Sequence, residues 1–312
     1  MPHADGHRPL LEPTARSQAS AASRQRLELA RNITSLCPTS FAREIAVTGS
    51  TSRGVANSRS DLELNLWSDL SPSDRLPAWL DLNLRWLKEA GQAKNFYVDQ
   101  TPIADGSFWA TCRIRGIWVE IGWQQLDIQA SWVDRLLSGN IVAHSLLTMA
   151  DALIHAVPVR TTGALAKWKA ALSEYPPALQ ERLIRDAIDS WTFPLHIEMS
   201  WKASGEHRLK YFEHLLADIH GVLRLVFAVN RIWEPDWKRL RRRVSSAMIK
   251  PTRMVSRITG ILHELDPFEA RAECYKLILE TLALVPGRFD GSRASEILTS
   301  SLMKHTNSHR VP

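Results

Sequence analysis

The first half of the chain alternates between apolar and polar positions. In residues 61–68, three leucines stand at every second position, with Asp61, Glu63 and Asn65 in the alternate positions. Successive side chains of a strand point to opposite faces, so the pattern predicts a half-buried strand. The same reasoning predicts strands in the segments 43–50, 95–100, 107–116 and 117–125, with a hairpin turn at Arg115–Gly116.

From about residue 131 the apolar positions recur every three to four residues, which is typical of amphipathic helices. This period predicts helices within 131–156, 163–175, 177–191, 206–233 and 268–286, and earlier ones at 24–35 and 73–90. The expected fold class is therefore α+β: a mixed β-sheet with flanking helices in residues 25–130, followed by an all-helical domain in residues 131–300. Residues 1–24, rich in Ala, Ser, Arg and Pro, are expected to form a disordered leader, and residues 301–312 a frayed tail.

The composition favours a cytoplasmic protein with an anionic partner. Hydrophobic residues make up 45% of the 312, and the chain contains no apolar run of the roughly 20 residues that cross a bilayer. The N-terminus lacks the apolar core of a secretory signal, and the three cysteines lie far apart without metal-ligand spacing. A net charge of +6 attracts nucleotides, nucleic acid or phosphorylated substrates.

Two carboxylates within one predicted strand are the main candidate for chemistry. Asp61 and Glu63 share a strand face, and Glu120 is a lone acid in the apolar segment 117–123. Like charges held close together repel, and a cation offsets that repulsion. Ligands that are all carboxylate oxygens suit Mg²⁺ or Mn²⁺. The alternative is a solvated strand face, with Glu120 paired to a nearby arginine.

A Gly-Ser turn precedes these acids. Gly49 and Ser50 offer exposed amides and a hydroxyl that can hold phosphate oxygens, and Arg53 and Arg59 in the following loop can neutralise a polyphosphate. A lone Gly-Ser is by itself only a turn. The order of strand, Gly-Ser, polar loop, Asp-x-Glu and a later Glu strengthens the joint signal.

The segment GSTSRGVANSRSDLEL, residues 49–64, resembles the signature of the DNA polymerase β-type nucleotidyltransferases. This superfamily includes the aminoglycoside and lincosamide nucleotidyltransferases, and the Asp-x-Glu form is similar to that of the kanamycin-type enzymes. The resemblance implies that Ser50 holds the β- and γ-phosphates of a nucleoside triphosphate, with ATP the expected donor. It also implies that Asp61, Glu63 and Glu120 bind the metal ions, Glu120 being placed by strand topology alone.

The helical half is expected to supply the acceptor pocket and further nucleotide contacts. Lys210, Tyr211 and Lys238 are the candidates for phosphate or base contacts, against the alternative of a solvated helix face. The surrounding run resembles the C-terminal half of a bacterial nucleotidyltransferase group of poorly assigned substrate. His196 and Glu198 are weaker candidates for contact with the acceptor.

Three functions remain open. The first is a metal-dependent nucleotidyltransferase that acts on a hydroxyl of a small molecule such as an aminoglycoside-like sugar. The second is a toxin-like enzyme that acts on tRNA or protein, since residues 238–253 contain seven basic residues and no acid. The third is a non-catalytic nucleotide-binding protein. No membrane partner is expected, and the chain is expected to be a monomer or homodimer.

Overall fold

The computed structural model describes residues 19–71, 84–91, 94–103 and 107–308. Contacts divide the chain into two compact units, a sheet unit of residues 11–137 and 149–174 and a helical unit that includes 138–148 and 175–312. Residues 1–18 of the expected leader and most of the predicted helix 73–90 lie outside the described residues, whereas residues 21–24 form the first turn of the helix α1 (Ala21–Thr34). Of that helix, α4 (Arg85–Gly91) is described.

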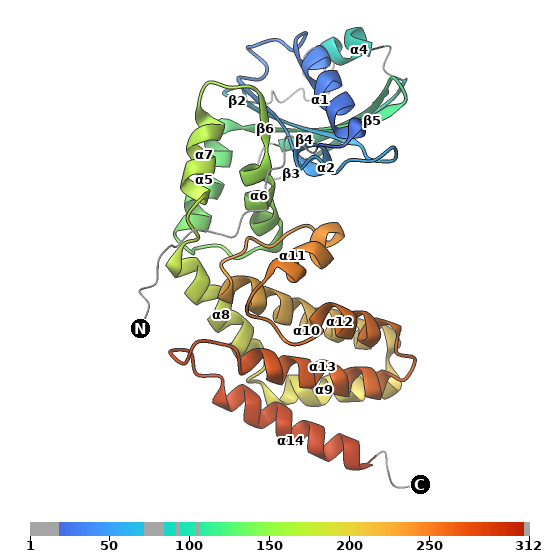
Figure 1. Cartoon of the computed structure of the whole chain (residues 1–312), viewed down its shortest axis with the longest axis vertical. Coiled ribbons are helices and arrows are strands. Elements are labelled where there is room, and N and C mark those ends of the chain that lie inside the picture. Colours follow the sequence, from blue (N-terminus) through green and yellow to red (C-terminus); the bar gives the residue numbers. More distant parts are fainter. Residues whose placement is uncertain (1–18, 72–83, 92–93, 104–106, 309–312) are drawn as a thin grey trace. The chain divides into compact units, whose positions relative to one another are not determined.

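In the described residues of the sheet unit, six strands form one sheet in the order β3-β4-β5-β2-β1-β6 (Figure 1). The strands are β1 (Glu44–Val47), β2 (Leu62–Ser68), β3 (Lys94–Ile103), β4 (Ser107–Ile114), β5 (Ile117–Gln125) and β6 (Val157–Arg160). Strands β2 and β5 run parallel, and the other neighbours run antiparallel. The predicted hairpin is present: Arg115 and Gly116 both have positive φ, as a two-residue turn between β4 and β5 requires.

One face of the sheet carries the hydrophobic core. Leu62, Leu64 and Leu66 are all buried there, beneath α1 (Ala21–Thr34). Figure 1 shows α1, in dark blue, lying across the sheet. The predicted alternation in β2 is therefore confirmed: leucines fill the core, and Glu63 and Asn65 lie on the opposite face, partly exposed.

The boundary predicted near residue 130 differs from the one observed. Residues 149–174 belong to the sheet unit because β6 pairs with β1 at the sheet edge. Strand β6 is short and contains Pro158, which a strand accepts at an edge, so its sequence does not show the usual strand pattern. Its Arg160 side chain donates to the carbonyls of Cys37 and Ala42, each at 2.8 Å, and so ties β6 to the segment between α1 and β1.

The predicted helix 131–156 is two helices, α5 (Leu126–Leu137) and α6 (His144–His155). Gly139 lies between them with φ +71°, a conformation that glycine adopts without the steric cost of a side chain. A further helix of the sheet unit, α7 (Ala164–Leu172), follows β6.

The helices of the helical unit confirm the helical period predicted for the chain after about residue 131. Its helices are α8 (Pro177–Ser190), α9 (Pro194–Glu206), α10 (Arg208–Val229), α11 (Leu240–Ser246), α12 (Met254–His263), α13 (Pro267–Leu282) and α14 (Ser292–Ser308). A buried ion pair lies in its core, where Arg271 of α13 contacts Asp218 of α10 at 2.6 Å, and the Trp191 indole donates to the same carboxylate. The expected frayed tail is instead helical as far as Ser308.

Candidate functional site

Two of the predicted acids lie side by side on the open face of the sheet. The parallel register pairs Glu63 of β2 with Glu120 of β5, so both side chains leave the same face from adjacent strands. Neighbouring strands lie about 4.8 Å apart, which brings the two carboxylates within reach of one cation. Both residues are partly exposed. Thr111 of β4 pairs with Glu120 on its other side, and sequence reasoning gave no sign of this neighbour.

The Gly-Ser turn closes over the same face. Thr48 donates its backbone N–H to the Glu63 carbonyl at 3.0 Å, and the four-residue helix α2 (Gly49–Ser52) then begins. Gly49 has φ +68°, and a Cβ built on it would lie 2.2 Å from Glu63 Oε1. The carboxylate of Glu63 thus occupies the space that any other residue at position 49 would fill. Glycine is required here both for its backbone conformation and for this close approach.

Asp61 lies directly before β2 and is partly exposed. Within the described residues, the carboxylates of Asp61, Glu63 and Glu120 are not a group whose oxygens all lie within 4.8 Å of one another. Glu63 and Glu120 share a sheet face, and two carboxylates held close together repel one another, which a divalent cation would offset.

The loop from α2 to β2 is fixed by α1. The buried Arg26 guanidinium donates to the Ser60 carbonyl, with its Nε at 2.9 Å, and so holds the residue that precedes Asp61. Ser23 of the same helix accepts the Ala56 N–H at 3.0 Å. Sequence reasoning missed both residues, because Arg and Ser are ordinary on an exposed helix face and only the tertiary contact gives them a role.

Arg53, a predicted phosphate contact, has a side chain that is engaged within the sheet unit. Its guanidinium forms an ion pair with Asp151 of α6 at 2.5 Å, with side-chain exposures of 3% and 2%. The same group contacts His155 Nδ1 at 3.2 Å. A buried guanidinium that is engaged in this way holds α2 against α6, and we therefore leave Arg53 out of the phosphate-binding set. Arg59, in contrast, is exposed on the loop.

The three candidates in the helical unit differ in accessibility. Tyr211 is only 4% exposed, and the Arg271 guanidinium lies over its ring at 5.5 Å. Its ring is therefore part of the packed interior of the helical unit. Lys210 is exposed and pairs with Glu213 at 2.9 Å. Lys238 is exposed in a 3₁₀ turn, η2 (Trp237–Arg239), that begins at Asp236.

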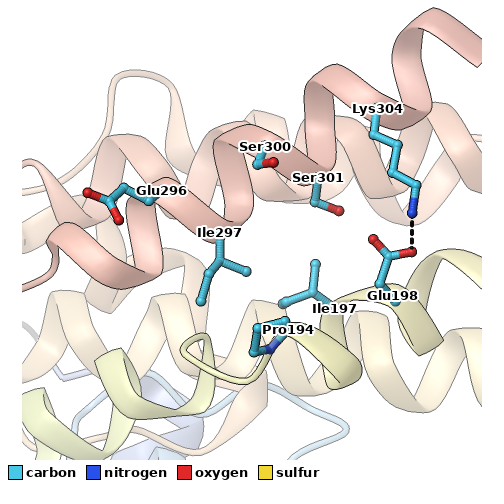
Figure 2. Close-up of a pocket in the computed structure, with 8 residues that line it drawn as sticks. All are labelled: Pro194, Ile197, Glu198, Glu296, Ile297, Ser300, Ser301 and Lys304. Atoms are coloured by element: carbon cyan, nitrogen blue, oxygen red, sulfur yellow. Dashed lines mark hydrogen bonds and ion pairs between the residues drawn. The ribbon is translucent and has the colours of Figure 1, made fainter.

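A pocket between α9 and α14 is shown in Figure 2 and has a volume of about 290 Å³. Glu198 and Lys304 close one side of it with an ion pair of 2.8 Å. A second, more apolar pocket of about 650 Å³ is lined by His196, His214 and Lys210, among others. Of the predicted nucleotide contacts in the helical unit, Lys210 lines this second pocket.

Comparison with known proteins gives a faint structural similarity. The chain matches no protein-family model and no curated protein. Among solved structures it is similar to a nucleotidyltransferase-like protein from Exiguobacterium sibiricum 255-15, with a TM-score of 0.38 and 13% identity over 90% of this chain and 78% of that one. A similarity at this level does not by itself establish a shared activity. Within the described part of the chain, no helix combines the length and apolar character needed to cross a membrane.

Proposed function

We propose that this protein transfers a nucleoside monophosphate, with AMP the expected group, from a nucleoside triphosphate to a hydroxyl and releases pyrophosphate. The observation that carries the proposal is the register of Glu63 against Glu120 on one sheet face, with Gly49 packed directly on the Glu63 carboxylate. Asp61 precedes the same strand. The packing of Gly49 on Glu63, within the segment that resembles the nucleotidyltransferase signature, supports the proposal.

The residues present fit a divalent metal of the Mg²⁺ or Mn²⁺ type. Asp61, Glu63 and Glu120 offer only oxygen ligands, which is the donor set that these ions prefer. The lack of a side chain at Gly49 leaves the Glu63 carboxylate room against the turn. When bound, such ions supply charge that stabilises the attacking and leaving oxygens of a phosphoryl transfer.

The protein's own groups perform the remaining tasks. The Ser50 hydroxyl and the amides of the turn hold phosphate oxygens, and Arg59 offsets the charge of the triphosphate. Glu120 accepts the proton of the attacking hydroxyl. In that step the acceptor oxygen forms a bond to the α-phosphorus, the bond from this phosphorus to the bridging oxygen breaks, and pyrophosphate leaves with the electron pair.

The decisive experiment uses the purified full chain with Mg²⁺, each labelled nucleoside triphosphate in turn, and three acceptor conditions: an aminoglycoside panel, total tRNA, and no acceptor. Asp61→Asn should abolish label transfer while the circular dichroism spectrum is unchanged. Asp69→Asn is the matched control, because Asp69 is an exposed acid at the far end of the same strand, paired with Arg43. Wild-type turnover by Asp61→Asn, or equal loss in both variants, would overturn the assignment.

The identity of the acceptor distinguishes the two possible enzymes, one that acts on a small molecule and one that acts on RNA. We infer a small hydroxyl compound, such as an aminoglycoside-like sugar, as the first candidate. RNA is the second, because Arg241 and Arg242 are exposed on α11, and Lys250 and Arg253 line a groove of about 550 Å³ beside it. An RNA acceptor predicts tRNA binding that weakens steeply with salt. If no tRNA binds at low salt, the RNA reading is wrong.

A further inference from the structure

A second group of ligand-type side chains lies in the helical unit, and the nucleotidyl-transfer proposal does not use it. His144, His220 and Glu234 place one ligand atom each within 4.8 Å of the others. They come from the start of α6, the middle of α10 and the segment after α10. Three residues so far apart in sequence meet only through the tertiary fold.

The end of α10 explains how Glu234 reaches this position. Arg231 adopts the left-handed conformation with φ +56°, and Ile232 N–H bonds to the Phe227 carbonyl at 2.9 Å, so the chain turns back at the helix end. Glu234 then meets residues of the helix that has just ended. His220 and Arg224 stand four residues apart on α10, and therefore on one helix face, where both contact the Glu234 carboxylate.

The two carboxylate oxygens of Glu234 contact different partners. Oε1 accepts from Arg224 Nε at 2.8 Å, and Oε2 lies 2.7 Å from His144 Nδ1 and 3.4 Å from His220 Nε2. The arginine therefore orients the carboxylate so that Oε2 is directed at both imidazoles. Burial alone would raise the pKa of Glu234, but hydrogen bonds from His144, His220 and Arg224 lower it to about 2.

Aromatic packing limits the movement of the two imidazoles. The His144 and His220 rings meet edge to face with centroids 5.0 Å apart, and Trp237 lies against both, at 4.8 and 4.9 Å. The Glu234 side chain is 3% exposed, whereas each histidine is 28% exposed. The cluster is thus buried on the carboxylate side and open to solvent on the imidazole side.

We propose that His144, His220 and Glu234 form a binding site for a Zn²⁺-type divalent ion, with a water or an anion as the fourth ligand. Two imidazoles and one carboxylate are a donor set that Zn²⁺ accepts and that Mg²⁺ does not favour. Tetrahedral Zn²⁺ with bonds of about 2.0 Å separates its ligand atoms by about 3.3 Å. The His220–Glu234 distance of 3.4 Å already matches, and His144 needs to move outward by a fraction of an ångström from its 2.7 Å contact.

The competing account is a hydrogen-bonded His–Glu–Arg network that binds no metal. The test strips the purified full chain with a chelator, dialyses it against ZnCl₂ with excess Mg²⁺, and measures bound zinc by mass spectrometry and affinity by calorimetry. We expect one equivalent of zinc, an X-ray absorption spectrum with two imidazole ligands, and at least a tenfold loss of affinity in His144→Gln and in His220→Gln. Arg224→Gln, which removes the group that orients the carboxylate, should cost about 10- to 100-fold.

The control is His207→Gln, since His207 is an exposed histidine of the same unit beside Glu206. Its zinc affinity should equal that of the wild type. A folded protein that binds no zinc, or one whose affinity is unchanged in His144→Gln and His220→Gln, would overturn the proposal. The double variant Asp61→Asn/Glu63→Gln should keep its zinc, so failure of the nucleotidyl-transfer proposal and failure of this one are distinguishable.

Discussion

The contact between Gly49 and the Glu63 carboxylate gives the sharpest test of the candidate active site. We predict that Gly49→Ala destabilises the sheet unit and abolishes nucleotidyl transfer, because the new Cβ would stand 2.2 Å from Glu63 Oε1 and 2.3 Å from its Cδ. Real Cβ atoms do not approach so closely, so Glu63 must leave its position. Gly116→Ala is the matched control: φ is +80° at that position, and a Cβ there meets nothing within 4 Å.

The expected loss of stability has two parts, the backbone strain of a left-handed alanine and the overpacking of its Cβ against Glu63. A left-handed alanine costs about 1–2 kcal/mol, and the reduced freedom of the unfolded chain returns about 0.4–1 kcal/mol, which leaves roughly 1 kcal/mol for Gly116→Ala. At Gly49 the displaced carboxylate adds an overpacking cost of about 1–3 kcal/mol. With about 2–4 °C of Tm per kcal/mol, the control should lose about 2–4 °C and Gly49→Ala about 4–16 °C.

The assay is a double-mutant cycle on thermal unfolding. Glu63→Ala removes the atoms that the new Cβ meets, so Gly49→Ala should cost about 1–3 kcal/mol less in that background than in the wild type. Label transfer is measured for Gly49→Ala alone at a temperature where both proteins are folded. If the coupling between the two sites is zero and Gly49→Ala is no worse than Gly116→Ala, the close approach does not exist and the reasoning fails.

Two further predictions test the electrostatics of the sheet unit. Arg53→Met should lower Tm strongly, because breaking a buried ion pair leaves the Asp151 charge uncompensated at a cost of about 3–5 kcal/mol. Arg59→Met should leave Tm unchanged and raise KM for the nucleotide. The reverse pattern of effects would contradict both assignments. Glu44→Gln should abolish a component of acid unfolding: burial raises the pKa of Glu44, but hydrogen bonds from Thr162 and neighbouring amides outweigh it and lower the pKa below 4.5. The stabilisation by the Glu44 carboxylate is complete above pH 4.5 and is lost as pH falls through the pKa of Glu44 in the folded protein. The free energies of unfolding of wild type and Glu44→Gln, measured by urea titration, should therefore converge at low pH. A constant difference between them across the pH range would contradict the assignment.

The pattern of apolar and polar residues predicted the buried leucines of β2 and the hairpin between β4 and β5. The leucines of β2 and the turn at Arg115–Gly116 depend on neighbouring residues, and such periodicity is visible in a single sequence. The parallel pairing of β2 with β5 depends on strand order, which periodicity does not contain. The sequence offers Glu120 only as a lone acid in an apolar segment, which the resemblance then assigns by strand topology; the observed register pairs it with Glu63.

A polar segment favours the expectation that its charged and aromatic side chains are accessible, but their burial depends on the tertiary fold. Tyr211 and Arg53 lie in segments rich in charge, yet each is buried by a partner more than fifty residues away, Arg271 in one case and Asp151 in the other. Glu234 stands in a segment without a recognisable motif, and it becomes the carboxylate of the His144 cluster only because α10 turns back at its end. Burial of a polar group is decided by the partner that compensates its lost hydration, and that partner is a property of the tertiary fold. A motif can therefore indicate which acids gather at a site, whereas the cations and imidazoles that complete it have to be found in three dimensions.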